Sequence, residues 1–445
     1  MKRRTSLSLL AGLLVLPALL VAQPRTPVTK LDLKDGDTVV FLGDSITHQC
    51  LYTQYIEDYY FTRYPDLDVR FHNAGVSGDR ATHALRRFES DVADFKPKYT
   101  TILLGMNDGS YRRFDQEIFD AYERDMSALM DKLDGLGSTV IAMGPTMYDS
   151  RVARTKPPRW LKDQEQIKQA TRYYNAVLAF YGTWLRDEAV HRGMGYVDLM
   201  APLNAHSTQV RLTEPDFTVI PDAVHPDANG QAIMAFEFLE QMNSDRSVST
   251  ITATLPKDKW VVRAGKTGGI SHVEGNEDML RFTFLARSLP WVLPEEASRG
   301  YELTKAGHKM SNEKLIIRGL KPGKYEMKID GVVIGEYSHA ALGAKVELQS
   351  NSKTPQYQQS LEVAMLNKER NEKAVRPYRN QYSKLKGQQS REIDIKDPAA
   401  FAKFMEQFEA ELGKLKQLND EYLEKIRTAA QPKPRHYVIT RVDSQ

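Results

Sequence analysis

Short apolar runs alternate with longer segments of helical spacing over residues 30–245. The runs, rich in Val, Ile and Leu and ending at Gly, Asn or Asp, lie at 38–42, 69–72, 99–104, 139–143 and 196–198. Such runs are typical of buried parallel strands. The segments at 116–133 and 164–186 carry apolar residues at helical intervals. This alternation predicts an α/β domain over 30–245, with a mostly parallel sheet covered by helices on both faces.

The pattern changes at 244–254, where Ser, Thr and Asp follow one another without a clear period, and we predict a domain boundary there. Beyond it, apolar side chains alternate with polar or small ones at 280–284 and at 325–329. The second run enters Asp330-Gly331 before another apolar stretch at 332–334, which is a strong signal for a two-residue hairpin turn. We therefore predict a small antiparallel sandwich or barrel over 255–348.

Residues 354–430 are highly charged, nearly free of glycine and helical in pattern. Steps of four and three residues define a heptad seam, formed by Phe401, Met405, Phe408, Leu412, Leu415, Asn419, Tyr422 and Ile426. Its polar member, Asn419, would fix the register at some cost in stability. A preceding helix over about 356–386 contains Pro377, which is expected to kink or divide it. We predict a helical hairpin followed by a C-terminal tail at 431–445; the seam packs on its own chain or forms a homodimer.

The first residues resemble a targeting segment. Three basic residues at 2–4 precede an apolar run at 7–21 that ends at Ala22. Because this run is shorter than the roughly 20 residues of a membrane span, it predicts a secretory signal peptide at 1–22 and a secreted or periplasmic protein; an uncleaved anchor is the alternative. The single cysteine, Cys50, allows no intramolecular disulfide and is expected to be a small buried residue.

Composition adds little to this picture. The chain has 445 residues, of which 41% are hydrophobic and 27% charged, which is ordinary globular usage. A net charge of +3 indicates neither nucleic acid nor an acidic lipid surface as a partner. We expect no stable membrane insertion beyond the targeting segment. The histidines show no metal-ligand spacing, and neither a metal nor a cofactor is expected.

Candidate chemistry begins directly after the first strand, at Gly43-Asp44-Ser45. The carboxyl ends of parallel strands collect reactive groups, and a following helix would present backbone N–H groups where an oxyanion develops. Asp and Ser are also favoured as helix caps, so this tripeptide alone leaves a purely structural reading open.

Three further loops carry groups that suit ester chemistry. A glycine-rich turn at 73–79 offers the backbone N–H of Gly78, and the loop at 105–108 offers the side-chain amide of Asn107 as a neutral donor. Near the end of the domain, Asp222 precedes His225 by three residues. That spacing lets the carboxylate hold one ring nitrogen while the other faces a serine.

These four blocks, in this order over residues 35–242, resemble the SGNH, or GDSL, hydrolase superfamily. The resemblance implies a flavodoxin-like three-layer α/β/α fold that needs no metal. It also implies Ser45 as the nucleophile, His225 as the general base and Asp222 as the orienting carboxylate. The oxyanion hole would comprise the backbone N–H groups of Ser45 and Gly78 and the Asn107 side chain.

Neighbouring residues have less specific roles. His48, one turn beyond Ser45, is an alternative base, but the sequence places nothing nearby to orient it. Four charged residues that flank the motifs are expected to brace loops: Asp44, Asp79, Arg80 and Asp108. Three aromatic residues either wall the substrate site or are buried: Tyr111, Tyr148 and Trp160.

The sequence as a whole predicts an exported esterase that hydrolyses O-acyl groups on small-molecule or polysaccharide substrates. Acetylated carbohydrate is favoured over lipid, because no large apolar lid is evident and an accessory β region is present. The enzymatic alternatives are a lysophospholipase, a short-chain acyl esterase or a thioesterase. An alternative of another class is a non-catalytic cell-envelope binding or scaffold protein that retains a hydrolase-like domain.

Overall fold

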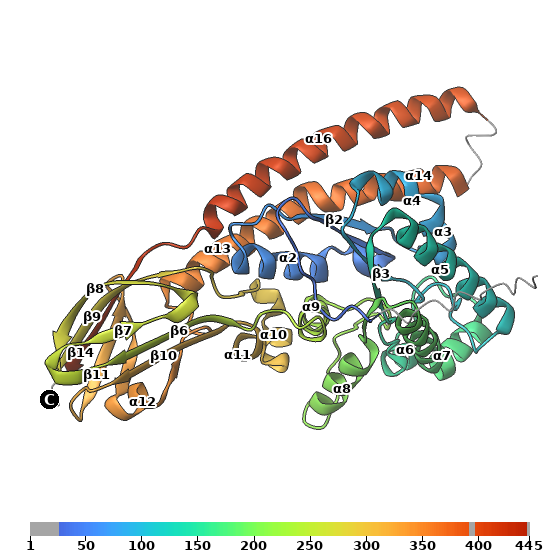
Figure 1. Ribbon diagram of the computed structural model, residues 1–445. Coiled ribbons are helices and arrows are strands. Elements are labelled where there is room, and N and C mark those ends of the chain that lie inside the picture. Colours follow the sequence, from blue (N-terminus) through green and yellow to red (C-terminus); the bar gives the residue numbers. More distant parts are fainter. Residues whose placement is uncertain (1–25, 391–396, 443–445) are drawn as a thin grey trace, which may run out of the picture.

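The computed structural model describes residues 26–390 and 397–442 (Figure 1). The predicted signal peptide at 1–22 lies outside the described residues. An α/β domain occupies one end of the molecule and a pair of β-sheets the other, and long C-terminal helices run along the α/β domain (Figure 1). None of the helices within the described ranges is both long and apolar enough to cross a bilayer.

The central sheet of the α/β domain has five strands in the order β2-β1-β3-β4-β5, and every neighbouring pair is parallel. The strands are β1 (Thr38–Gly43), β2 (Arg70–Gly75), β3 (Tyr99–Leu103), β4 (Thr139–Met143) and β5 (Gly195–Val197). Nearly all of their side chains are buried, as the continuous apolar runs predicted. The three-layer α/β/α fold predicted from the sequence is confirmed.

Helices cover both faces of this sheet. They are α1 (Ser45–His48), α2 (Leu51–Arg63), α3 (Ala81–Arg86), α4 (Phe88–Asp91), α5 (Gln116–Leu136), α6 (Ser150–Thr155), α7 (Gln164–His191), α8 (Met200–Arg211) and α9 (Ala228–Gln241). Local signals set their ends: the Asp115 side chain caps the start of α5, and Gly137 adopts a left-handed conformation at its end. Cys50, at the start of α2, is buried as expected.

Residues 247–348 and the last strand of the chain form two sheets that share one apolar core. The four-stranded sheet has the order β13-β10-β6-β7, and the five-stranded sheet has the order β12-β11-β14-β9-β8. The strands are β6 (Ser247–Thr254), β7 (Val261–Arg263), β8 (Gly268–Asn276), β9 (Met279–Ala286), β10 (Asn312–Arg318), β11 (Lys324–Ile329), β12 (Val332–Ser338), β13 (Val346–Glu347) and β14 (Arg435–Val442). Asp330 and Gly331 both have positive φ in the β11–β12 turn, as the hairpin signal predicted.

Three expectations for this region were wrong. The predicted boundary at 244–254 contains strand β6, because Val248, Ile251 and Ala253 supply a buried face. Since β6 pairs with β10 in parallel, the sandwich is not purely antiparallel. The predicted tail at 431–445 contains β14, which lies between β9 and β11 and buries Tyr437 and Ile439.

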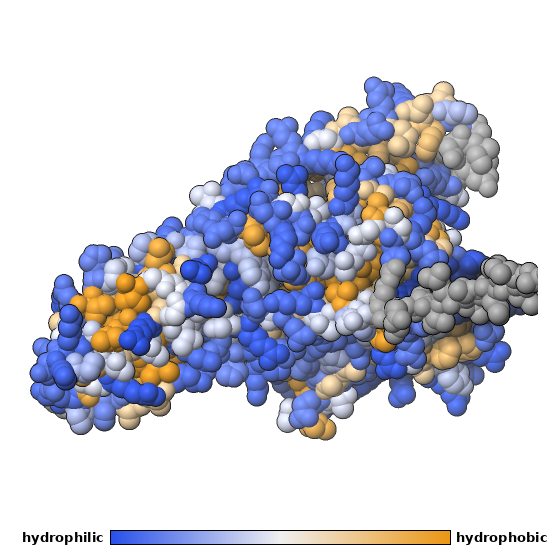
Figure 2. Space-filling view, in the orientation of Figure 1, coloured by the Kyte–Doolittle hydropathy of each residue, from blue (hydrophilic) through white to orange (hydrophobic). Residues whose placement is uncertain are grey.

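Three short helices lie between strands of this region: α10 (Ser298–Thr304) and α11 (Ala306–Met310) between β9 and β10, and α12 (His339–Ala344) between β12 and β13. The first two pack on α9. The preceding loop carries Trp291, which is fully buried and whose ring N–H donates to the Tyr55 carbonyl at 2.9 Å. The sandwich is thereby joined to the core of the α/β domain. Figure 2 shows a largely hydrophilic face over the α/β domain and an apolar area over the sandwich.

The C-terminal helices are α13 (Pro355–Arg370), a π-helical turn η5 (Asn371–Val375), α14 (Arg376–Ser390) and α16 (Pro398–Ala430). The π-helical turn stands directly before Pro377, where the sequence predicted a kink or a break. The heptad seam of α16 faces α13 and α14 of its own chain, and its residues Phe408, Leu412, Leu415, Tyr422 and Ile426 are buried.

Candidate active site

Ser45 lies at the carboxyl end of the sheet, where β1 turns into α1. The turn is tight: a Cβ atom on Gly43 would collide with the Thr47 side chain, so only glycine fits. The Asp44 carboxylate accepts the backbone N–H of Ile46 at 2.9 Å and caps the helix. These contacts fix the position of the Ser45 hydroxyl.

A chain of two hydrogen bonds joins the serine, a histidine and an aspartate. The Nε2 atom of His225 lies 2.8 Å from Ser45 Oγ, and its Nδ1 atom lies 2.7 Å from Asp222 Oδ2. The other oxygen of Asp222 accepts the backbone N–H groups of Val224 and His225. An Nδ1–H donated to the carboxylate leaves the Nε2 lone pair free to accept the serine proton.

The turn that carries this pair has a left-handed residue, Ala223, with φ of 72°. Burial alone would raise the pKa of Asp222, but the hydrogen bonds from the His225 ring and backbone outweigh it and lower this pKa to about 2. The carboxylate therefore stays ionised at neutral pH and stabilises positive charge on the imidazole ring.

Two of the predicted oxyanion donors, Gly78 and Asn107, lie next to Asp79. Gly78 follows β2 with φ of 70°, in the left-handed region that favours glycine. The Asn107 amide nitrogen donates to the Asp79 carbonyl at 3.0 Å and lies 3.4 Å from the Asp44 carboxylate. The Tyr111 hydroxyl donates to the amide oxygen of Asn107 at 2.9 Å, which fixes the orientation of the amide. Asn107 is thus held beside the turn that carries Ser45.

The buried carboxylates around these loops brace the backbone. Asp108 accepts the N–H groups of Ala81 and Gly105, each at 2.9 Å. Burial raises the pKa of Asp108 to about 6 and that of Asp44 to about 7. These contacts agree with the loop-bracing roles expected from the sequence.

The ring of His48 forms hydrogen bonds with a loop and with a helix, and none of its described hydrogen bonds reaches Ser45. Its Nδ1 accepts the backbone N–H of Ser77 at 3.2 Å, and its Nε2 lies 3.0 Å from Asn380 Oδ1 on α14. Burial lowers the pKa of His48 to about 4, so the ring is neutral at ordinary pH. The His48 ring therefore joins the loop after β2 to helix α14. Its position does not support the alternative in which His48 is the general base.

The three aromatic residues divide into two groups. The Trp160 side chain is exposed (47% for the residue), and its ring centroid lies 5.7 Å from that of His225. Tyr111 and Tyr148 are buried behind it, with 6.0 Å between the ring centroids of Tyr111 and Trp160. Trp160 is therefore the member of this group that offers an open face beside the imidazole.

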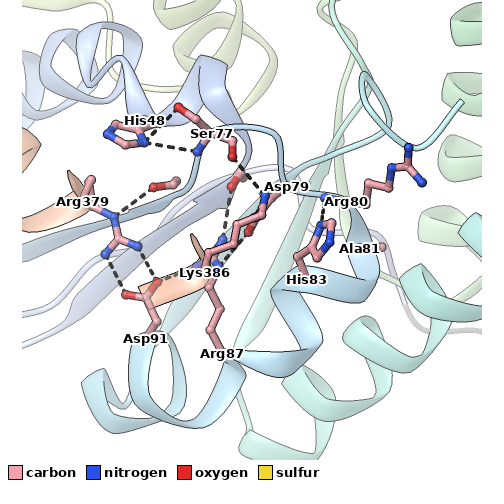
Figure 3. Close-up of polar contacts among 12 residues, drawn as sticks. His48, Ser77, Asp79, Arg80, Ala81, His83, Arg87, Asp91, Arg379 and Lys386 are labelled. Carbon is pink, nitrogen blue, oxygen red and sulfur yellow. Dashed lines mark hydrogen bonds and ion pairs between the residues drawn. The ribbon is translucent and has the colours of Figure 1, made fainter. Parts of the chain in front are cut away.

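Sequence reasoning missed the polar residues that α14 brings to this site (Figure 3). Arg379 donates to the Gly75 carbonyl at 3.0 Å and forms a fully buried ion pair with Asp91. Lys386 donates to the Ser77 carbonyl at 3.0 Å and to the Asp79 carboxylate at 2.8 Å. In the sequence these residues appear only as basic residues of a predicted helix, about 300 positions after the loops that they contact. Nothing in that pattern indicates which groups they bind.

A hydroxyl, an imidazole and a carboxylate in series at the carboxyl edge of a parallel α/β sheet are the arrangement of serine hydrolases, which attack acyl carbons through the hydroxyl. Comparison with known proteins agrees. Residues 41–233 match the model of the GDSL-like Lipase/Acylhydrolase family. This match covers most of the α/β domain and supports the resemblance to the SGNH, or GDSL, hydrolase superfamily, and the protein is a carboxylic ester hydrolase.

Two relatives indicate how far the similarity extends. An acetylxylan esterase of Geobacillus stearothermophilus is 26% identical over 230 residues, which cover 46% of this chain and 94% of that protein. The solved structure of a gut microbial diltiazem-metabolizing enzyme matches 94% of this chain and 100% of its own, with a TM-score of 0.79 and 24% identity. The second likeness concerns the fold alone and extends it to the sandwich and the C-terminal helices.

Proposed function

We propose that the protein is an exported serine esterase that removes O-acyl groups, chiefly acetyl groups on carbohydrate, through an acyl-enzyme on Ser45. The observation that carries the proposal is the position of the His225 ring, which is hydrogen-bonded to Ser45 on one side and to Asp222 on the other.

In the first half of the reaction, His225 takes the proton of Ser45 while Oγ attacks the acyl carbon. The backbone N–H groups of Ser45 and Gly78 and the Asn107 amide receive the oxyanion. Collapse of the tetrahedral intermediate breaks the ester C–O bond, and the imidazolium returns its proton to the leaving alcohol. Water then repeats the sequence on the acyl-enzyme and releases the carboxylic acid.

The surroundings of the triad support a short acyl group on a sugar. Trp160 offers an exposed indole face beside His225, and indole faces stack readily on sugar rings. Tyr111 and Tyr148, which could have formed a second wall, are buried. The acetylxylan esterase relative acts, by its name, on an acetylated polysaccharide, which favours the same substrate class here.

The nucleophile is tested by labelling with a fluorophosphonate probe. We expect the wild-type protein to be labelled and Ser45→Ala to be unlabelled and inactive. Ser271→Ala is the matched control, because the exposed Ser271 hydroxyl contacts His272 on strand β8 of the sandwich and not His225. Labelling that persists in Ser45→Ala would contradict the proposed nucleophile, and an unlabelled wild type would favour a non-catalytic binding protein.

The substrate class is tested by parallel kinetics on aryl acetate, butyrate and octanoate esters and on acetylated xylo-oligosaccharide. We expect kcat/KM to fall as the acyl chain lengthens and Trp160→Ala to raise KM for the oligosaccharide more than for aryl acetate. A rate that rises with chain length would instead indicate a lipid esterase. Export is tested by N-terminal sequencing of the mature protein, which should begin near residue 23.

A further inference from the structure

Helix α14 lies against the end of α1 and against β2 with the loop that follows it, and its side chains donate hydrogen bonds to backbone carbonyls of both segments. Figure 3 shows the contacts of Arg379 and Lys386. Arg376 donates to the Gln49 carbonyl at 2.6 Å, and Arg379 donates to the Gly75 carbonyl at 3.0 Å. Lys386 reaches the loop between β2 and α3. The helix therefore touches the backbone on which the candidate site is built.

Lys386 holds the residues on both sides of Gly78. Its ammonium group donates to the Ser77 carbonyl oxygen at 3.0 Å and to the Asp79 carboxylate at 2.8 Å. The Ser77 carbonyl and the Gly78 N–H belong to the same peptide group, which is planar and trans, so the two bonds point in opposite directions. A donor that fixes the carbonyl therefore also fixes the direction of the Gly78 N–H.

The same contact also polarises this peptide group. Hydrogen bonds in series strengthen one another, and a charged donor on the carbonyl makes the opposite N–H a better donor. Glycine with φ of 70° has much conformational freedom, so this peptide gains from an external restraint. The restraint by Lys386 also reaches Asn107, because Lys386 holds Asp79 and the Asn107 amide nitrogen donates to the Asp79 carbonyl.

We propose that Lys386 is a positioning residue for the oxyanion hole. It orients the Gly78 N–H through the Ser77 carbonyl, and it steadies Asn107 through Asp79. This inference rests on the proposed function, in which Gly78 and Asn107 receive the oxyanion. It assigns the C-terminal helical segment a part in ester hydrolysis in addition to packing.

The anchoring of α14 makes this role physically feasible. Arg379 and Asp91 form an ion pair with both side chains fully buried, and the Tyr382 hydroxyl donates to the Ser90 carbonyl at 3.1 Å. Lys386 itself is 26% exposed, and Arg87 remains bonded to Asp79 at 2.8 Å if the lysine is replaced. Loss of the ammonium group therefore creates neither a core cavity nor an unpaired buried carboxylate.

The test compares Lys386→Met with Lys384→Met, an exposed lysine of the same helix that contacts Gln381. With an aryl acetate as substrate, we expect Lys386→Met to lower kcat by roughly 10- to 100-fold, the scale of a small displacement in an active site. KM and the melting temperature should stay close to wild type. Lys386→Arg should restore part of kcat, and Lys384→Met should be unchanged.

A double-mutant cycle separates positioning from a general structural effect. In an Asn107→Ala background, Lys386→Met should cost clearly less than in the wild type, because both changes damage the same oxyanion hole. An unchanged kcat in Lys386→Met, or equal costs in both backgrounds, would overturn the inference. Ser45→Ala separates the two proposals: if it remains active, the proposed function fails, whereas an inactive Ser45→Ala with fully active Lys386→Met refutes only the role of Lys386.

Discussion

At the scale of single residues, the site combines short-range and long-range determinants. Asp222 and His225 are held in one turn by hydrogen bonds between residues three apart. Asn107, in contrast, depends on Tyr111 for the orientation of its amide and on the Asp79 carbonyl for its position. Side chains that donate to a developing oxyanion contribute most when they are held in place before the reaction.

Asn107→Ala should lower kcat by about 10²- to 10³-fold, the usual effect of losing one oxyanion donor, while the protein stays folded. Tyr111→Phe removes only the hydroxyl that orients the amide and should have a smaller effect. Steady-state kinetics together with circular dichroism would check both variants. An Asn107→Ala enzyme with wild-type kcat would remove this residue from the oxyanion hole.

The buried Asp44 carboxyl predicts a pH-dependent stability. Its pKa in the folded protein is raised by burial to about 7, compared with an ordinary 3.8. Between these values the folded state holds a proton that the unfolded state has lost, so stability falls as pH rises, by about 1.4 kcal/mol per unit. Asp44→Asn should lack this contribution. Its free energy of unfolding, measured by chemical denaturation from pH 4.5 to 8, should rise relative to wild type up to about pH 7, and parallel curves would contradict the prediction.

At the scale of elements, the C-terminal helices owe their place to buried polar contacts as well as to the apolar seam. Arg370 on α13 pairs with Glu57 on α2 at 2.7 Å, and its Nε donates to Asn419 on α16 at 2.8 Å. The polar member of the seam thus has a partner within its own chain, which explains how an asparagine is accommodated among apolar residues. Heptad periodicity is compatible with a hairpin or a homodimer, and it is this contact that favours the intramolecular hairpin.

Asp91→Asn should reduce the free energy of unfolding by about 3–5 kcal/mol, because it leaves the buried guanidinium of Arg379 without its counter-charge. Glu89→Gln, which affects only an exposed pair with Lys132, should change it little. Burial opposes ionisation of Asp91, but Arg379 and Arg87 hold its pKa well below the usual range. The stabilisation is therefore present above about pH 4 and is lost at lower pH. Urea denaturation at pH 7 and pH 3 would measure both effects.

At the scale of the whole molecule, the C-terminal segments pack against domains that earlier residues form. After the sandwich, the chain passes along the α/β domain as α13 and α14, comes back as α16, and ends as β14 inside the five-stranded sheet (Figure 1). Because β14 bonds to β9 on one side and β11 on the other, the sandwich cannot be completed without it. The three parts of the molecule are therefore interlocked.

Ile439→Asp should destabilise the protein by at least the roughly 2–5 kcal/mol of a large-to-small core change, since it also buries a charge. Thr440→Asp, on the exposed face of the same strand, should be close to neutral. Thermal unfolding of the two variants gives the comparison. Equal melting temperatures would mean that this segment is a tail, as its sequence first indicated.

The sequence by itself determined the strands of the α/β domain and the local chemistry of this protein. Three features depend only on residues that are close in sequence: the strands of the α/β sheet, the turn at Asp330-Gly331 and the pairing of Asp222 with His225. Periodicity and spacing in the sequence predict such local features. The first three motifs, each after a successive strand, also placed Ser45, Gly78 and Asn107 at one edge of the sheet, because parallel strands end together.

Only the tertiary structure decided which distant segments meet. Strand β14 follows a long helix and has little period of its own, so its place between β9 and β11 could not be inferred from 435–442 alone. The contacts of Lys386 and Arg379 end on backbone carbonyls, which every residue has, and no sequence pattern marks such an acceptor. Pairings of this kind are settled by the packing of the whole chain.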